Sequence, residues 1–169
     1  MTVSTGLVIR PARPSDTATL VALVIELATF EDARDEVELD DTALARVLFG
    51  EAPTVFCDVA ESDGEIVGSS IWFVNYSTWT GTHGIYLEDL YVRPSARRLG
   101  IGRALIAVLA GRAVERGYRR VEWSVLDWNE GAIGLYESVG ALAMSEWTRF
   151  RLSGDALERF AATEGLTAI

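Results

Sequence analysis

Apolar residues recur along the chain with two periods, and these periods predict its helices and strands. Leu20, Leu23, Val24 and Leu27 follow the spacing of an amphipathic helix, which we expect over residues 15–30 with Ser15 as its cap. Alternating apolar and polar residues predict strands, two of them joined by a turn that contains Asp-Gly. The expected order is strand 7–9, helices 15–30 and 41–48, strands 54–60, 65–75 and 85–92, helix 101–116, strand 121–125, helix 127–140, strand 141–152 and helix 153–160.

This order predicts a mixed α/β fold. A helix connects strands 85–92 and 121–125, so these two should run parallel, because a helical crossover returns the chain in the same direction. At 169 residues, without a repeat or a linker, the chain is expected to form one domain over 1–169 with a sizeable core.

Composition excludes several classes of function. The formal net charge of −10 argues against nucleic acid as a partner, and it suits either a cationic substrate or solubility alone. We expect no membrane span, since no apolar run reaches about 20 residues, and no secretory signal. A single cysteine, Cys57, fits a cytoplasmic protein, and with one histidine it makes a zinc site improbable.

A short loop before the helix at residue 101 carries the clearest chemical signal. It reads Arg97-Arg98-Leu99-Gly100-Ile101-Gly102. Glycines let the backbone approach a ligand closely, and the helix N-terminus favours an anion such as a pyrophosphate. The loop lacks the third glycine of a dinucleotide fingerprint and the Gly-Lys-Ser/Thr of a nucleotide-triphosphate loop. A strand-to-helix turn without a ligand is the alternative.

The chain resembles the GNAT superfamily of N-acetyltransferases, and within it the spermidine/spermine (diamine/thialysine) branch. The resemblance rests on three blocks of sequence: Phe30-Glu31, then Tyr86-Leu87-Glu88-Asp89 running into the Arg97–Gly102 loop, then Trp128-Asn129-Glu130 with Leu135-Tyr136-Glu137 and Gly140-Ala141. It implies a mostly antiparallel sheet with a parallel pair at an acetyl-CoA cleft, flanked by helices. It also implies acetyl-CoA as co-substrate, no metal, and a homodimer.

The resemblance further implies a role for each matching residue. Tyr136 would protonate the departing thiolate, and Glu88 would accept the proton of the amine, through water. The residues expected to contact acetyl-CoA are Leu90, Tyr91, Val92, Arg97, Arg98, Leu99, Gly100, Ile101, Gly102, Arg103, Asn129, Glu130, Gly131, Ala132 and Tyr136. The residues expected to line the amine pocket are Phe30, Glu31, Trp79, Glu88, Asp89, Glu122, Trp123, Ser124 and Glu146.

Each assignment has a structural alternative. Tyr136 shares a helical face with Ala132 and Ile133 and could belong to the core, and Asn129 could simply cap its helix. Strict alternation would send Glu88 and Asp89 to opposite faces of their strand. A proton transfer from an alkylammonium to an unperturbed glutamate is also uphill by about 8 kcal/mol, so the acceptor needs burial or a water chain.

The sequence departs from this branch at Ser77-Thr78-Trp79, which keeps an aromatic residue but lacks the branch's acidic residue. A shorter diamine or a thialysine-like amino acid is therefore as plausible a substrate as a long polyamine. The sequence predicts an acetyl-CoA-dependent N-acetyltransferase that acts on a small cationic primary amine. The alternatives are a peptide or protein N-acetyltransferase and a non-catalytic acyl-CoA-binding module.

Overall fold

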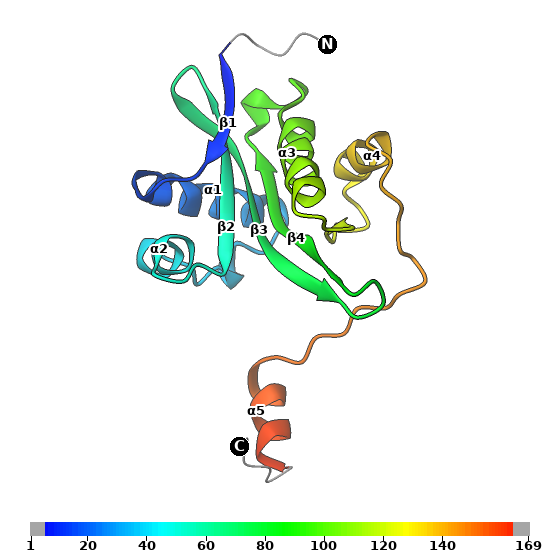
Figure 1. Cartoon of the computed structure of the whole chain (residues 1–169). Coiled ribbons are helices and arrows are strands. Elements are labelled where there is room, and N and C mark those ends of the chain that lie inside the picture. Colours follow the sequence, from blue (N-terminus) through cyan, green and yellow to red (C-terminus); the bar gives the residue numbers. More distant parts are fainter. Residues whose placement is uncertain (1–5, 164–169) are drawn as a thin grey trace. The chain divides into compact units, whose positions relative to one another are not determined.

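The computed structural model of the chain describes residues 6–163 (Figure 1). The chain divides into two compact units, one ending at Leu135 and the other beginning at Tyr136, so the boundary lies inside a helix. The first unit contains β1 (Leu7–Pro11), α1 (Thr17–Phe30), α2 (Asp41–Phe49), β2 (Val55–Ser62), β3 (Glu65–Ser77), β4 (Thr82–Val92), α3 (Ile101–Glu115), β5 (Val121–Glu122) and the start of α4 (Glu130–Ser138). The second contains the end of α4 and α5 (Gly154–Thr163).

The five strands form one sheet in the order β1-β2-β3-β4-β5. The first four strands are antiparallel neighbours, and β4 and β5 are parallel. The predicted mixed α/β fold and its parallel pair are therefore confirmed. The predicted hairpin is confirmed as well, since Asp63 and Gly64 both adopt left-handed φ angles, +51° and +84°, as a two-residue turn of this kind requires.

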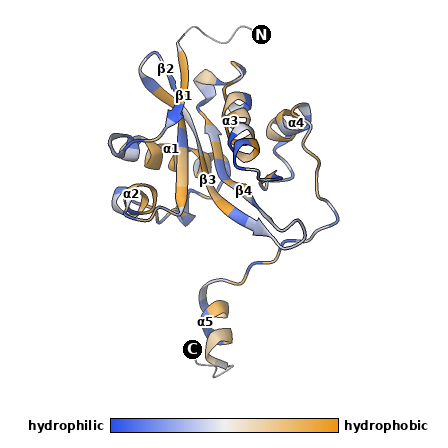
Figure 2. Ribbon diagram, viewed as in Figure 1, coloured by the Kyte–Doolittle hydropathy of each residue, from blue (hydrophilic) through white to orange (hydrophobic). Residues whose placement is uncertain are grey.

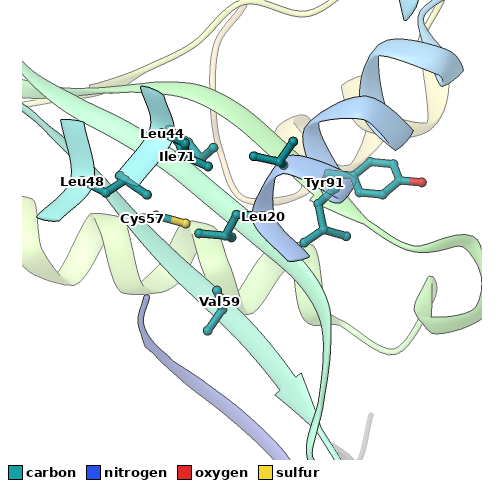
Figure 3. Close-up of a cluster of buried hydrophobic side chains, with 9 residues drawn as sticks. Leu20, Leu44, Leu48, Cys57, Val59, Ile71 and Tyr91 are labelled. Atoms are coloured by element: carbon teal, nitrogen blue, oxygen red, sulfur yellow. The ribbon is translucent and has the colours of Figure 1, made fainter. Parts of the chain in front are cut away.

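The core consists of two apolar layers on opposite faces of the sheet. Helices α1 and α2 cover one face, where Leu20, Leu44 and Leu48 pack on Cys57, Val59, Ile71 and Tyr91 (Figure 3). Helix α3 covers the other face, and its Leu109 packs on Trp72, Ile85 and Leu87. Figure 2 shows hydrophobic residues along the strands and α1, with hydrophilic residues on the connecting turns. Among the described residues, no helix combines the length and apolar composition needed to cross a membrane.

A buried ion pair fixes α3 to the sheet. Asp58 of β2 is fully buried and accepts a hydrogen bond from Trp72 Nε1 at 3.0 Å. Arg112 of α3 pairs with the same carboxylate through both terminal nitrogens, and its guanidinium lies 5.3 Å from the centre of the Trp72 ring. Because a buried carboxylate needs a counter-ion and hydrogen bonds, this contact sets the position of α3 over β2 and β3.

Three predictions about local structure are wrong. Residues 141–152 form no strand, because no strand among residues 6–163 pairs with them, and an extended segment needs such a partner for its N–H and C=O groups. Strand β5 stops at Glu122 rather than at residue 125. Ser15 does not cap α1, because residues 14–16 form a 3₁₀ turn whose Asp16 binds Arg10 and the backbone N–H of Arg13.

Candidate active site

The two parallel strands diverge directly after they meet. Ile85 and Tyr86 of β4 pair with Val121 and Glu122 of β5, and within the described residues the ladder extends no further. Among the described residues, the edge of β4 on the β5 side therefore has no strand partner from Leu87 onward. A free strand edge presents backbone N–H and C=O groups that an extended ligand can use.

Strand β4 contains a β-bulge at its acidic residues. The register against β3 shifts by one position between Leu87 and Asp89, which leaves Glu88 as the extra residue. The flanking side chains of Leu87 and Leu90 both pack on the α3 side of the sheet. Leu87 and Leu90 thus point to the same face although two residues lie between them. Those two residues, Glu88 and Asp89, both point to the opposite face, toward α1. The expectation of opposite faces is therefore wrong.

A third carboxylate, Glu31, stands at the C-terminal end of α1. The pKa of Asp89 is raised to about 6, mainly because the side chain is buried and further because the charges of Glu88 and Glu31 act on it. Burial also raises the pKa of Glu31. An ion pair of 3.0 Å between Arg93 and Glu26 holds α1 against the end of β4, so the three carboxylates are presented by anchored elements.

Aromatic residues stand close in sequence to two of these carboxylates, since Phe30 precedes Glu31 and Tyr91 lies two residues after Asp89. The Phe30 ring lies 5.5 Å from that of Trp128, which belongs to the segment after β5. The Arg97 guanidinium lies 5.0 Å from the Phe30 ring and 5.8 Å from that of Tyr91, and Arg97 Nε donates to the carbonyl oxygen of Val92 at 3.0 Å. A largely apolar pocket of about 350 Å³ lies beside this row and is lined by Ile25, Glu26, Thr29, Phe30, Tyr91, Pro94 and Arg97.

Sequence reasoning missed this row of rings. It assigned Phe30 to the amine and Arg97 to the pyrophosphate, and it gave Trp128 no role. The only signal in the sequence is that the three residues come from the three blocks that carry the family resemblance. Contacts between such distant blocks depend on how the elements pack, which a single sequence does not reveal.

The loop before α3 has the geometry of an anion site. Arg98 and Gly100 adopt left-handed φ angles of +63° and +80°, and Gly100 is the N-cap of α3, where it makes no side-chain capping hydrogen bond. The N–H groups at a helix N-terminus such as this one, around Ile101, favour a negatively charged ligand. Gly102 has a packing role, because a Cβ there would lie 3.1 Å from Leu135 of α4.

Asn129 caps α4, as the structural alternative proposed: its Oδ1 accepts a hydrogen bond from the backbone N–H of Ala132 at 3.2 Å. Glu130 and Gly131 follow in the first turn, and Gly131 has open space where a Cβ would project. Tyr136 lies further along the same helix, in the second unit.

Several residues expected in the amine pocket have other surroundings. Glu122 pairs with Arg120 at 2.8 Å and accepts from Asn75 Nδ2 at 3.0 Å, so its charge is already compensated. Trp123 packs into the apolar layer beneath α3, on the opposite face from Asp89. The hydroxyl groups of Tyr86 and Ser124 lie 3.0 Å apart, on the two diverging segments.

Two further predicted residues lie apart from the carboxylates or in the other unit. Trp79 is 86% exposed and lies in the β3–β4 turn, beyond the end of β3 at Ser77. Asp89 pairs with Ile71 of β3, and Ser77 lies six residues further along that strand, or roughly 20 Å away. Glu146 belongs to the irregular segment of the second unit. No group of three or more His, Cys, Asp or Glu side chains suited to a metal ion occurs among residues 6–163.

Comparison with known proteins identifies the family. Residues 20–141 match the model of the acetyltransferase (GNAT) family. Thialysine N-epsilon-acetyltransferase of Bos taurus is 38% identical over 164 residues, which cover 90% of this chain and 96% of that protein. L-ornithine N5-acetyltransferase of Arabidopsis thaliana is 34% identical over 158 residues, which cover 87% of this chain and 67% of that protein.

The fold agrees with solved structures. An integron cassette protein from the mobile metagenome of V. cholerae superimposes with a TM-score of 0.77 at 25% identity, and the match covers 94% of this chain and 99% of that one. The chain belongs to the GNAT acetyltransferase family, and it is an N-acetyltransferase.

Proposed function

We propose that this enzyme transfers an acetyl group from acetyl-CoA to a primary amine of a small cationic molecule, such as a diamine, a polyamine or a thialysine-like amino acid. One observation carries the proposal: the charges of Glu31 and Glu88 both act on Asp89, beside the edge of β4 that has no strand partner among the described residues. Carboxylates attract an ammonium group, and the net charge of −10 steers cations toward the protein. Relatives named for thialysine and ornithine acetylation support the same chemistry.

Acetyl-CoA fits the groups on the other side of this edge. Its pyrophosphate would lie against the loop from Arg97 to Arg103 and the first turn of α3. Its pantetheine arm would extend along Leu90, Tyr91 and Val92, where β4 lacks a partner, and meet Asn129 to Ala132 at the start of α4. In this proposal the side chain of Arg97 holds the Phe30 ring at the amine pocket, and the backbone of Arg97 forms part of the loop that binds the pyrophosphate.

The chain's own groups then supply the acid–base chemistry. Backbone N–H groups at the β4 bulge would orient the thioester carbonyl and stabilise charge on its oxygen. Glu88 would take the proton of the bound ammonium through water, and Tyr136 would give a proton to the departing thiolate. No covalent intermediate with the protein is needed, because the free amine attacks the thioester directly.

The test is thiol release from acetyl-CoA with spermidine, spermine, putrescine, thialysine, lysine, an aminoglycoside and a short peptide as acceptors. Fast release with one of the small amines supports the proposal. Release with the peptide alone would assign the enzyme to peptide or protein amines. Binding of acetyl-CoA without release on any acceptor would favour a non-catalytic acyl-CoA-binding module.

We further propose that the enzyme is a homodimer and works in the cytoplasm. Residues 141–152 keep the alternation of a strand and expose Leu142 (85%) and Phe150 (91%), which suits pairing with a second copy. The single cysteine is buried and needs no oxidising compartment. Light scattering from the purified protein tests the dimer, since a monomeric mass at micromolar concentration would contradict it.

A further inference from the structure

The bulge in β4 gives two neighbouring acidic residues, Glu88 and Asp89, different exposure to solvent. Glu88 and Asp89 share the α1 face, but Glu88 is exposed whereas Asp89 is largely covered. Asp89 stands opposite Ile71 and next to Tyr91, both of which belong to the apolar layer under α1. One carboxylate therefore meets solvent, and the other meets a mostly apolar surrounding.

The groups that face Asp89 do not compensate its charge. Glu88 on its own strand and Glu31 at the end of α1 both act on it as negative charges. Cys57 of β2 is buried, and burial raises the pKa of its thiol, so it stays neutral. Among residues 6–163 no group donates a hydrogen bond to the Asp89 carboxylate, and the two arginines that follow β4, Arg93 and Arg97, contact Glu26 and the Phe30 ring instead.

We infer that Asp89 is the group that finally accepts the proton of the substrate ammonium, and that Glu88 relays this proton through water. The inference rests on the proposed function, and it assigns the proton acceptor of that reaction. Glu31 and Glu88 hold the cationic substrate at the mouth of the site. Asp89, deeper and poorly solvated, gains most by becoming neutral.

The raised pKa of Asp89 narrows the gap in proton affinity between this carboxylate and the substrate ammonium. An alkylammonium has a pKa near ~10.4. An unperturbed aspartate lies more than six powers of ten below that value, whereas Asp89, with its pKa raised to about 6, lies about four below. An acceptor with a pKa near the working pH is also the best general base, because it is still largely ionised at pH 7 and yet binds a proton well.

The protons balance over one turnover. The ammonium loses two: one goes to the Asp89 carboxylate and then to bulk water, and the other ends on the sulfur of CoA. The C–N bond forms as the C–S bond breaks, and the sulfur leaves with the electron pair of that bond. Asp89 returns to its ionised form before the next substrate binds.

The experiment compares pH profiles of turnover for wild type, Asp89→Asn and Glu88→Gln, with thialysine as the amine, or putrescine if thialysine is inert. In the wild type we expect the rate to fall tenfold per pH unit below about pH 6. In Asp89→Asn we expect kcat to be about 100-fold lower at pH 7.5, and we expect the acidic limb of the profile, the fall of the rate below about pH 6, to be absent. The rate should rise again toward pH 9.5, because free amine accumulates there. Glu88→Gln should keep the limb, moved to lower pH, and raise KM for the amine.

Loss of the limb in Glu88→Gln with its retention in Asp89→Asn would overturn the inference and leave the proposed function standing. A wild type that acetylates no amine would overturn both. A measurement independent of turnover is ¹³C NMR titration of the Asp89 carboxyl in the substrate-free protein. A titration midpoint near pH 6 that moves to lower pH in Glu31→Gln supports the inference. A midpoint near pH 4 contradicts it. Far-UV circular dichroism checks that each variant is folded.

Discussion

Replacing Asp89 by asparagine should stabilise the folded protein at neutral pH. The native surroundings raise the pKa of Asp89 from 3.8 to about 6, so between these values the folded state binds a proton more tightly than the unfolded chain. Above pH 6, keeping this carboxylate ionised in the fold costs about 3 kcal/mol, since one pKa unit corresponds to about 1.4 kcal/mol. Asparagine has nearly the same shape and carries no charge.

The sign of the effect follows from proton linkage. Because the folded state holds the extra proton, the contribution of Asp89 to the free energy of unfolding falls as pH rises from about 4 to 6. Asparagine does not titrate. The advantage of Asp89→Asn over wild type should therefore be small at pH 4.5 and grow to as much as about 3 kcal/mol at pH 7.5.

Urea unfolding followed by tryptophan fluorescence at pH 4.5, 5.5, 6.5 and 7.5 measures this difference. Asp35→Asn is the matched control, because it makes the same chemical change at an exposed aspartate and should alter stability by less than about 0.5 kcal/mol. A destabilised Asp89→Asn, or a difference that does not grow with pH, would refute the reasoning. A stabilised but inactive variant would show that the site holds an unfavourable charge for its chemistry.

Three other predictions concern the ion pair, the helix cap and the proposed acid. Arg112→Leu should destabilise the protein by about 3–5 kcal/mol in urea unfolding, because Asp58 is left buried without a counter-ion, and adding Asp58→Asn should restore part of the loss. Asn129→Ala should cost about 1 kcal/mol and lower Tm by about 3 °C, whereas Asn129→Ser should lose little. Tyr136→Phe should lower kcat by about 100-fold with little change in the Kd of acetyl-CoA measured by calorimetry, and an unchanged kcat would remove Tyr136 from the mechanism.

Local patterns in the sequence were enough for most of the fold. The Asp63-Gly64 turn needs two residues that tolerate left-handed φ, and Gly117 ends α3 for the same reason. The spacing of Leu20, Leu23 and Leu27 predicts α1 because a helix buries one stripe, whatever it packs against. The glycine loop is equally local, since its backbone angles and the helix N-terminus lie within a few residues.

The arrangement of the carboxylates was decided by tertiary structure. A register shift between β3 and β4 makes Glu88 an extra residue and turns it to the same face as Asp89, and such a shift belongs to a pair of strands. Residues 141–152 have the alternation of a strand but no strand to pair with, because a ladder needs two sides. Periodicity along one chain thus predicts which faces are apolar, whereas pairing and packing determine which charges meet, and in this enzyme the chemistry of the proposed site depends on that meeting.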